Sequence, residues 1–166
     1  LGATTAYVIP ETDPGRSALS RYAGALTESA DRAIDSGLRF CVEHFPGRAL
    51  PTAERTLEFL RGINHPNLFL LLDVGHIQIS NEDPAAVIAN AGPLLGYVHL
   101  NDNDGKGDQH LPLLDGILTI DILHRTFRAL NDNRYTGSVS LELNPSLADP
   151  LEGLNRSRSL VESLAQ

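Results

Sequence analysis

Short apolar segments alternate with longer amphipathic segments five times along this chain. The apolar segments predict β-strands, and they lie at Thr4–Ile9, Leu38–Glu43, Leu68–Asp73, Tyr97–Leu100 and Ser138–Leu143. The run Leu68–Asp73 is almost entirely apolar, which is typical of a strand that is buried on both faces of a sheet. The alternation therefore predicts an α/β fold built on a parallel sheet.

The segments between the strands carry the signals of helices. Over Ser17–Ser36 apolar residues recur at helical spacing, and Gly37 follows as a stop signal. Asp83 and Pro84 predict the N-cap and the first residue of another helix. Further helices are expected over about Thr52–Arg61, over Thr119–Leu130 and from Asp149 onward. Two folds fit these βα units, a doubly wound sheet and part of a (β/α)8 barrel; the first strand is not followed by GxGxxG, which disfavours a dinucleotide-binding sheet.

Size and charge narrow the class of protein. The 166 residues suit one domain, which we expect to span 1–166. The net charge of −8 disfavours nucleic acid or an anionic membrane as a partner, because both bind clustered cations. No apolar run approaches the roughly 18 residues of a membrane span, and the N-terminus lacks the basic start of a secretion signal. A single cysteine, Cys41, excludes an intrachain disulfide, so we expect a cytoplasmic protein.

Four of the five predicted strands carry a potential metal ligand at their carboxyl ends. These residues are Glu43, Asp73, His99 and Glu142. In a barrel the carboxyl ends of the strands meet at one mouth, so we expect the four side chains to lie together. Strand alternation then also turns Cys41 and Ser140 toward the barrel interior. Three carboxylates and one imidazole suit a divalent cation such as Mn²⁺, Mg²⁺, Co²⁺ or Zn²⁺, which would relieve the repulsion among the carboxylates.

The residues at the strand ends resemble those of one known superfamily. The resemblance lies in Leu72-Asp73-Val74-Gly75-His76, in Val98-His99-Leu100-Asn101-Asp102, and in Glu43 and Glu142. This pattern resembles the xylose-isomerase-like TIM-barrel superfamily, which includes sugar and sugar-phosphate isomerases and epimerases, inosose dehydratases and apurinic-site endonucleases. The resemblance covers essentially the whole chain. It implies an incomplete TIM barrel whose five βα units correspond to strands 4–8, with the first three units absent; the lack of any Met agrees with that expectation.

The resemblance also implies roles for individual residues. It makes the metal ligands Glu43, Asp73, His99 and Glu142, with Mn²⁺ as the preferred metal. In the sugar epimerases that this chain is similar to, the equivalents of Glu43 and Glu142 double as base and acid on the two faces of an enediolate. His76 would contact a substrate oxygen or a second metal. Asp108 and His110 resemble a pair that the endonucleases use for additional metals; the alternative is that they belong to a solvated polar loop.

We therefore expect a metal-dependent isomerase or epimerase that acts on a small sugar, sugar phosphate or polyhydroxy carbonyl compound. Arg48, just past the second strand, has the fork geometry to bind a substrate carboxylate or phosphate, although such residues more often pair locally. Ala49 stands where related epimerases often keep a second Glu that holds substrate.

Two other hypotheses come from different classes. One is a metal phosphodiesterase similar to the apurinic-site endonucleases, which the acidic charge disfavours. The other is an inactive barrel fragment. The unpaired edges of such a fragment would lead copies of the chain to associate as a homo-oligomer.

Overall fold

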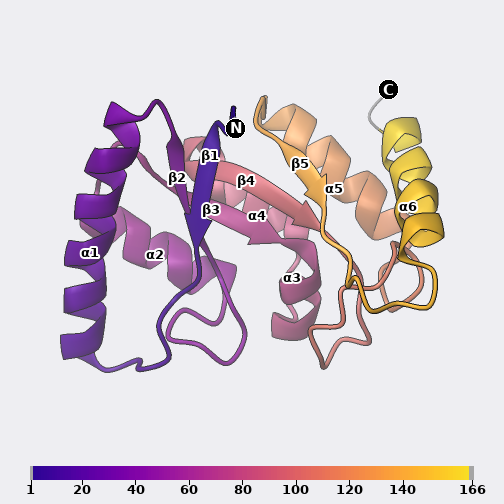
Figure 1. The fold of residues 1–166 in the computed structure, drawn as a ribbon, viewed down its shortest axis with the longest axis horizontal. Helices are drawn as coiled ribbons and strands as arrows, with labels where there is room; N and C mark the ends of the chain where they lie inside the picture. The colour runs from indigo at the N-terminus through magenta and orange to yellow at the C-terminus, as the bar shows by residue number, and fades with distance from the viewer. Residues whose placement is uncertain (1, 165–166) are drawn as a thin grey trace.

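The computed structural model of the protein describes residues 2–164. Within that range five strands form one sheet, in which neighbours are parallel and the spatial order is the chain order. The strands are β1 (Thr5–Val8), β2 (Arg39–Glu43), β3 (Leu68–Asp73), β4 (Leu95–Leu100) and β5 (Val139–Leu141). Figure 1 shows that the sheet is curled, with β1 and β5 at its two edges.

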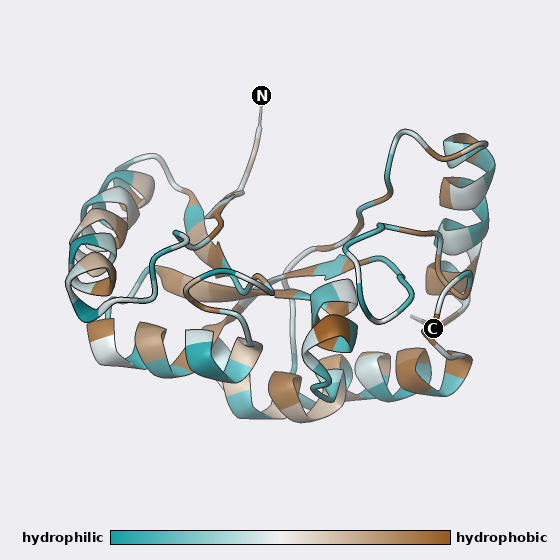
Figure 2. Ribbon diagram, turned by 90° about the horizontal axis from the view of Figure 1, so that it is seen from below, coloured by the Kyte–Doolittle hydropathy of each residue, from teal (hydrophilic) through white to brown (hydrophobic). Residues whose placement is uncertain are grey.

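Helices follow the strands and cover the convex side of the sheet. They are α1 (Arg16–Asp35), α2 (Ala53–Ile63), α3 (Val74–Ser80), α4 (Pro84–Ala91), α5 (Ile120–Asp132) and α6 (Pro150–Leu164), with a short 3₁₀ helix η1 (Gly92–Leu94) before β4. Figure 2 shows the helices along the outside of a curved, half-open ring. The chain is thus an incomplete TIM barrel of five βα units, which confirms the predicted fold.

The two faces of the sheet differ in chemistry. Phe40 and Val42 on β2 point outward into the core under the helices, as do alternate residues of β3. Cys41 points inward, as predicted, where its Sγ packs against Gly96 of β4 together with Phe69. A Cβ atom on Gly96 would lie 2.4 Å from the Phe69 Cβ and 2.7 Å from the Cys41 Sγ, so only glycine permits this inner packing.

Local hydrogen bonds explain where several helices begin. The Thr52 side chain accepts a hydrogen bond from the Arg55 N–H at the start of α2, and Thr119 does the same for Ile122 at the start of α5. The predicted N-cap position of Asp83 and the first helical position of Pro84 are confirmed, but the Asp83 side chain acts differently from those of Thr52 and Thr119. Asp83 occupies the N-cap position of α4, but its carboxylate lies 2.8 Å from Arg125 of α5 and caps no helical N–H.

The structure contains one helix that the sequence did not predict, and several element boundaries differ from the prediction by one or two residues. The helix α3 was not expected, because it directly follows the apolar run of β3. The strand β4 begins at Leu95 rather than Tyr97. The strand β5 ends at Leu141, so Glu142 lies just beyond it; even so, the Glu142 N–H donates to the Leu100 carbonyl over 3.1 Å, which keeps Glu142 beside β4.

Candidate functional site

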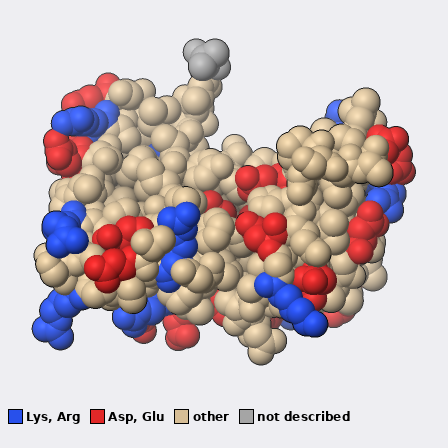
Figure 3. Space-filling view, turned by 60° about the horizontal axis from the view of Figure 1, so that its bottom comes forward, with Lys and Arg blue, Asp and Glu red and all other residues tan. Residues whose placement is uncertain are grey.

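Four side chains meet at the carboxyl ends of neighbouring strands. We call Glu43, Asp73, His99 and Glu142 the first cluster; each offers a ligand atom that lies within 4.8 Å of those of the other three. The Nδ1 atom of His99 lies 2.6 Å from a Glu142 oxygen and 3.8 Å from an Asp73 oxygen. All but Glu142 are buried. Figure 3 shows acidic side chains gathered in the hollow at the middle of the molecule.

The structure brings together the four residues that the sequence singled out, and it adds others that hold them. The Asp73 carboxylate caps α3 by accepting the His76 N–H at 2.8 Å, and it also accepts the Asn101 side-chain amide at 2.7 Å. Gly75 must be glycine, because a Cβ there would lie 1.8 Å from the Asn101 Oδ1. The ring of His99 packs edge-on against the ring of Tyr97, with centroids 4.8 Å apart.

The carboxylates of the first cluster have divergent acidities. Burial raises the pKa of Glu43 to about 7, and the neighbouring Asp73 carboxylate adds to that rise. Burial also raises the pKa of Asp73. A hydrogen bond with His99 lowers the pKa of Glu142. Crowding of negative charge at a buried site is the situation that a bound cation relieves, so the donor set and the electrostatics both fit a divalent metal ion.

A second group lies beside the first. We call His76, Asp108 and His110 the second cluster; their ligand atoms also lie within 4.8 Å of one another. The Nδ1 atom of His76 lies 2.9 Å from the His44 carbonyl, and the Nδ1 atom of His110 lies 3.2 Å from the Glu142 carbonyl. A carbonyl only accepts, so both Nδ1 atoms carry the proton. The Nε2 atoms of His76 and His110 then lie 3.4 Å and 2.9 Å from an Asp108 oxygen. Because neither Nε2 atom carries the ring's first proton, each needs a second proton or a cation between it and the carboxylate.

Without a cation, the second cluster is expected to hold protons. A hydrogen bond with Asp108 raises the pKa of His110 to about 9. Burial opposes protonation of His76, but the hydrogen bond with Asp108 and nearby carboxylates outweigh burial and raise its pKa to about 9 as well. Burial acts to raise the pKa of Asp108, but the two histidines hold it well below its usual range.

These shifts predict how the stability of the metal-free chain depends on pH. Between about pH 6.5 and 9 the folded state keeps protons on His76 and His110 that the unfolded state has released, so stability falls as pH rises through this window. We expect the melting temperature in EDTA to fall by several degrees between about pH 6.5 and 9, and we expect Asp108→Asn to remove most of that pH dependence. Thermal melts at several pH values measure the slope. Asp35→Asn, which removes a carboxylate outside both clusters, is the control, and an equal slope in Asp108→Asn would contradict the assignment.

The loop that carries Asp108 and His110 is anchored at its base, while Asp104, Lys106, Asp108 and Gln109 are exposed. Asp102, near the start of the loop, is fully buried, and its carboxylate accepts hydrogen bonds from the Gln78 side chain and from the N–H groups of Asn103, Gly116 and Leu118. A Cβ on Gly116 would lie 2.1 Å from the Asn103 carbonyl. Sequence reasoning missed the roles of Asn101 and Asp102, although the polar run directly after β4 was visible.

Arg48 lies outside both clusters. Its guanidinium is 3.3 Å from the Pro10 carbonyl and 5.4 Å from the centre of the Phe45 ring. The Phe45 ring also lies close to His76, with ring centres 4.5 Å apart. Arg48 therefore pairs locally in this structure.

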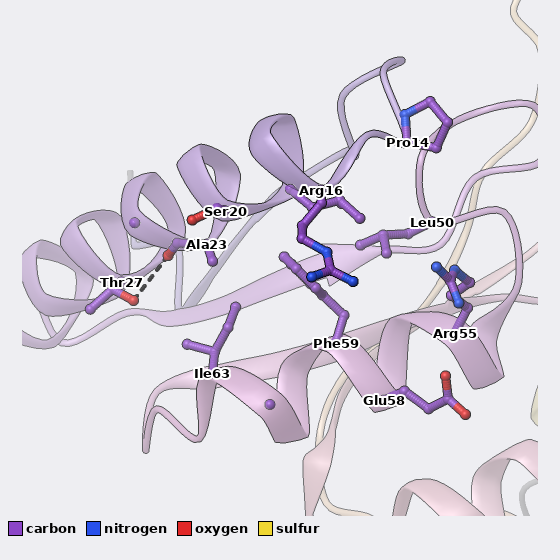
Figure 4. Close-up of a pocket in the computed structure, with 13 residues that line it drawn as sticks. Pro14, Arg16, Ser20, Ala23, Thr27, Leu50, Arg55, Glu58, Phe59 and Ile63 are labelled. Atoms are coloured by element: carbon purple, nitrogen blue, oxygen red, sulfur yellow. Dashed lines mark hydrogen bonds between the residues drawn. The ribbon is translucent and has the colours of Figure 1, made fainter.

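A groove of about 720 Å³ lies between α1 and α2, on the helix side of the sheet. Figure 4 shows Phe59 and Ile63 of α2 facing Ala23 and Thr27 of α1, with Arg16 and Arg55 toward one end. None of the residues in either cluster lines this groove. It is thus separate from the candidate site.

Comparison with known proteins identifies the family to which this fold belongs. The model of the family described as "Xylose isomerase-like TIM barrel" matches residues 1–163. The chain belongs to this family. Among curated xylose isomerase-like proteins, it is 30% identical over 118 residues to D-psicose 3-epimerase of Agrobacterium fabrum, covering 68% of this chain and 37% of that protein. It is 27% identical over 161 residues to inosose dehydratase of Clostridium botulinum, covering 86% of this chain and 53% of the relative.

A solved structure of the same fold extends the comparison. The crystal structure described as "IOLI protein with a binding zinc atom" superposes with a TM-score of 0.79 at 20% identity, and the match covers 99% of this chain and 64% of that one. The chain thus spans between about a third and two thirds of the length of these xylose isomerase-like proteins. In residues 2–164, no helix is long and apolar enough to cross a membrane.

Proposed function

We propose that this chain supplies the metal-binding and proton-transferring part of an isomerase or epimerase. Its substrates would be small sugars, sugar phosphates or related polyhydroxy carbonyl compounds. The observation that carries the proposal is the first cluster, in which three carboxylates and an imidazole from four neighbouring strand ends offer ligand atoms within 4.8 Å of one another. The names of the relatives, a sugar 3-epimerase and an inosose dehydratase, support this substrate class.

The first cluster would hold one divalent cation. Mn²⁺ is our preferred metal, and Mg²⁺, Co²⁺ and Zn²⁺ accept the same mixture of carboxylate and imidazole ligands. The ligands would be Glu43, Asp73, His99 and Glu142. When bound, the cation would polarise the carbonyl and neighbouring hydroxyl oxygens of a sugar and stabilise the negative charge that develops on them.

Glu43 and Glu142 differ in acidity, as an acid–base pair requires. Without a bound cation, burial raises the pKa of Glu43 to about 7, whereas the hydrogen bond with His99 lowers the pKa of Glu142, so Glu43 is the better candidate for the acid and Glu142 for the base. In the proposed reaction the Glu142 carboxylate takes the proton from the carbon next to the substrate carbonyl, which leaves an enediolate. Glu43 then donates a proton to the opposite face of that carbon, and its configuration is inverted.

The second cluster borders the proton-transfer site. The Nδ1 atom of His76 is 3.5 Å from the Glu43 carboxylate, and the Glu142 carbonyl holds His110. We propose that His76 contacts a substrate oxygen or that it holds a second cation together with Asp108 and His110. The metal-binding role uses the Nε2 lone pairs that the backbone carbonyls leave free, whereas in the other role the protonated Nε2 atom of His76 donates to the substrate oxygen.

Incorporation of solvent deuterium into sugars tests the proposed function. A panel of ketoses and aldoses is incubated in D₂O with the protein and Mn²⁺, and loss of the C–H signal next to the carbonyl is followed by NMR. We expect exchange in at least one sugar, dependent on the cation and abolished by EDTA. Elemental analysis is expected to find a divalent metal in the purified protein. No exchange in any sugar, by the chain alone or in a closed barrel, would contradict the proposal.

The second cluster supports one alternative. Additional cations held by His76, Asp108 and His110 would suit a metal phosphodiesterase that cleaves DNA at abasic sites. The net charge of −8 disfavours binding to DNA. Nicking of abasic DNA, with affinity that falls steeply as salt rises, and no exchange in the sugar panel would replace the isomerase by this alternative.

A further inference from the structure

His44 occupies a position between the two clusters. It directly follows Glu43 and is fully buried. The Nε2 atom of its ring accepts the backbone N–H of Asp73 at 3.2 Å, and its own carbonyl accepts the Nδ1–H of His76 at 2.9 Å. The two imidazole rings meet edge to face, with centroids 5.6 Å apart. One residue thus contacts a member of each cluster.

The position of His44 follows from the staggered ends of two strands. The pairing of β2 with β3 ends at Glu43 opposite Leu71, so β3 continues for two residues beyond its last partner in β2. The N–H of Asp73 therefore has no strand carbonyl on that side, and a buried N–H without an acceptor is costly. The ring of His44 supplies the acceptor. Because a backbone N–H can only donate, the Nε2 atom carries no proton and the ring is the neutral Nδ1–H form.

We infer that His44 is a positioning residue that sets Asp73 and His76 in one arrangement. Its ring fixes the turn at which β3 ends and α3 begins, and this turn carries the Asp73 carboxylate into the first cluster. Its carbonyl fixes the tautomer of His76, whose Nε2 atom is thereby turned toward Asp108. The inference rests on the proposed function in one respect, that the first cluster binds a cation.

Three substitutions separate positioning from packing. In His44→Gln the Oε1 atom reaches about as far as the histidine Nε2 and can accept the Asp73 N–H. In His44→Asn the side chain is one bond shorter and cannot reach. In His44→Leu the volume is largely kept and the acceptor is lost. Thr56→Val is the matched control, because it removes the side-chain hydrogen bond of another fully buried residue, from Thr56 to the Thr52 carbonyl at the start of α2, outside both clusters.

The first measurement is hydrogen–deuterium exchange at the Asp73 amide, which needs no metal. We expect exchange at least about 10-fold faster in the Asn and Leu variants, and protection close to that of the unsubstituted chain in the Gln variant. The second is the dissociation constant for Co²⁺, read from its visible absorption. Loss of a residue that orients a ligand typically weakens metal binding by about 10–100-fold, so this loss is expected for Asn and Leu and is expected to be recovered in Gln.

The outcomes distinguish the inference from the proposed function. Unchanged Asp73 protection in the Asn and Leu variants, or equal loss in Gln and Asn, would overturn the role of His44. A loss of Co²⁺ affinity in Thr56→Val as large as in His44→Leu would show that general destabilisation is the cause, and would overturn it as well. If the unsubstituted chain binds no Co²⁺, the proposed metal centre fails, and the amide exchange still decides whether His44 holds Asp73.

Discussion

Residues 1–166 on their own are expected to turn over sugar substrates at less than about 1% of the rate that they reach in a closed barrel. Loss of orientation alone commonly costs about 10²-fold, and an open half-barrel lacks one wall of the mouth in which a substrate would be held. The four ligands of the first cluster are all present, so the defect lies in substrate binding and alignment rather than in the ligand set.

The chain alone also leaves the two edges of its sheet open. Among the described residues, β1 pairs only with β2 and β5 only with β4, so each edge strand has one row of unpaired backbone groups. Tyr7 on β1 is 43% exposed, although it lies on the inner face and packs edge-on against His99. Glu142 follows the other edge strand and is only partly buried. The chain is therefore expected to bind an apolar dye and to associate through these edges.

The test compares the chain alone with the chain supplied with three further βα units from a related sugar 3-epimerase. Mass, dye binding, cooperativity of melting and turnover are measured for both. We expect the added units to suppress association and dye binding and to raise turnover by about 10²-fold. A monodisperse, cooperatively folding monomer of residues 1–166 with full turnover would show that the open edges are harmless.

The strands and the strand-end residues of the first cluster were accessible from the sequence because both depend on local patterns, whereas the choice of a barrel over a doubly wound sheet depended on the family resemblance. The apolar run of Leu68–Asp73 predicts a buried strand, and the helix that follows was missed for the same reason, since Val74 continues the apolar run. The helix α3 has only seven residues, or about two turns. It depends on the Asp73 carboxylate at its start and on the left-handed Asn81 at its end. Such short helices depend on caps and tertiary contacts more than on periodicity.

Other features depend on partners that are distant in the chain. The strand β4 runs through Gly96, where Phe69 and Cys41 fill the space that a side chain would need. Asp102 looks like one of several loop carboxylates, and only the folded chain brings Gly116 to it. The role of His44 depends on the register of β2 against β3, which no local pattern encodes.

Replacing Glu142 with Gln is expected to lower the rate of C–H exchange in the substrate by about 10³-fold or more. A positioned base contributes about 10²–10⁴-fold, and this carboxylate is also a proposed ligand of the cation. The amide keeps the size of the side chain and a carbonyl oxygen, but it has no charge to accept the proton or to pair with His99, 2.6 Å away. Glu142→Asp keeps the charge and withdraws it by one methylene, so an intermediate loss is expected.

The measurement is deuterium incorporation from solvent at saturating Mn²⁺, in whichever form of the protein, open or closed, shows exchange. Saturating metal separates the two roles of Glu142: weakened metal binding is recovered at high Mn²⁺, whereas loss of the base is not. Glu54→Gln, an exposed position in the first turn of α2, controls for the change of charge. If Glu142→Gln exchanges the substrate proton at the unsubstituted rate once Mn²⁺ saturates, Glu142 is a ligand alone and the base must be sought at Glu43, the other carboxylate of the proposed pair.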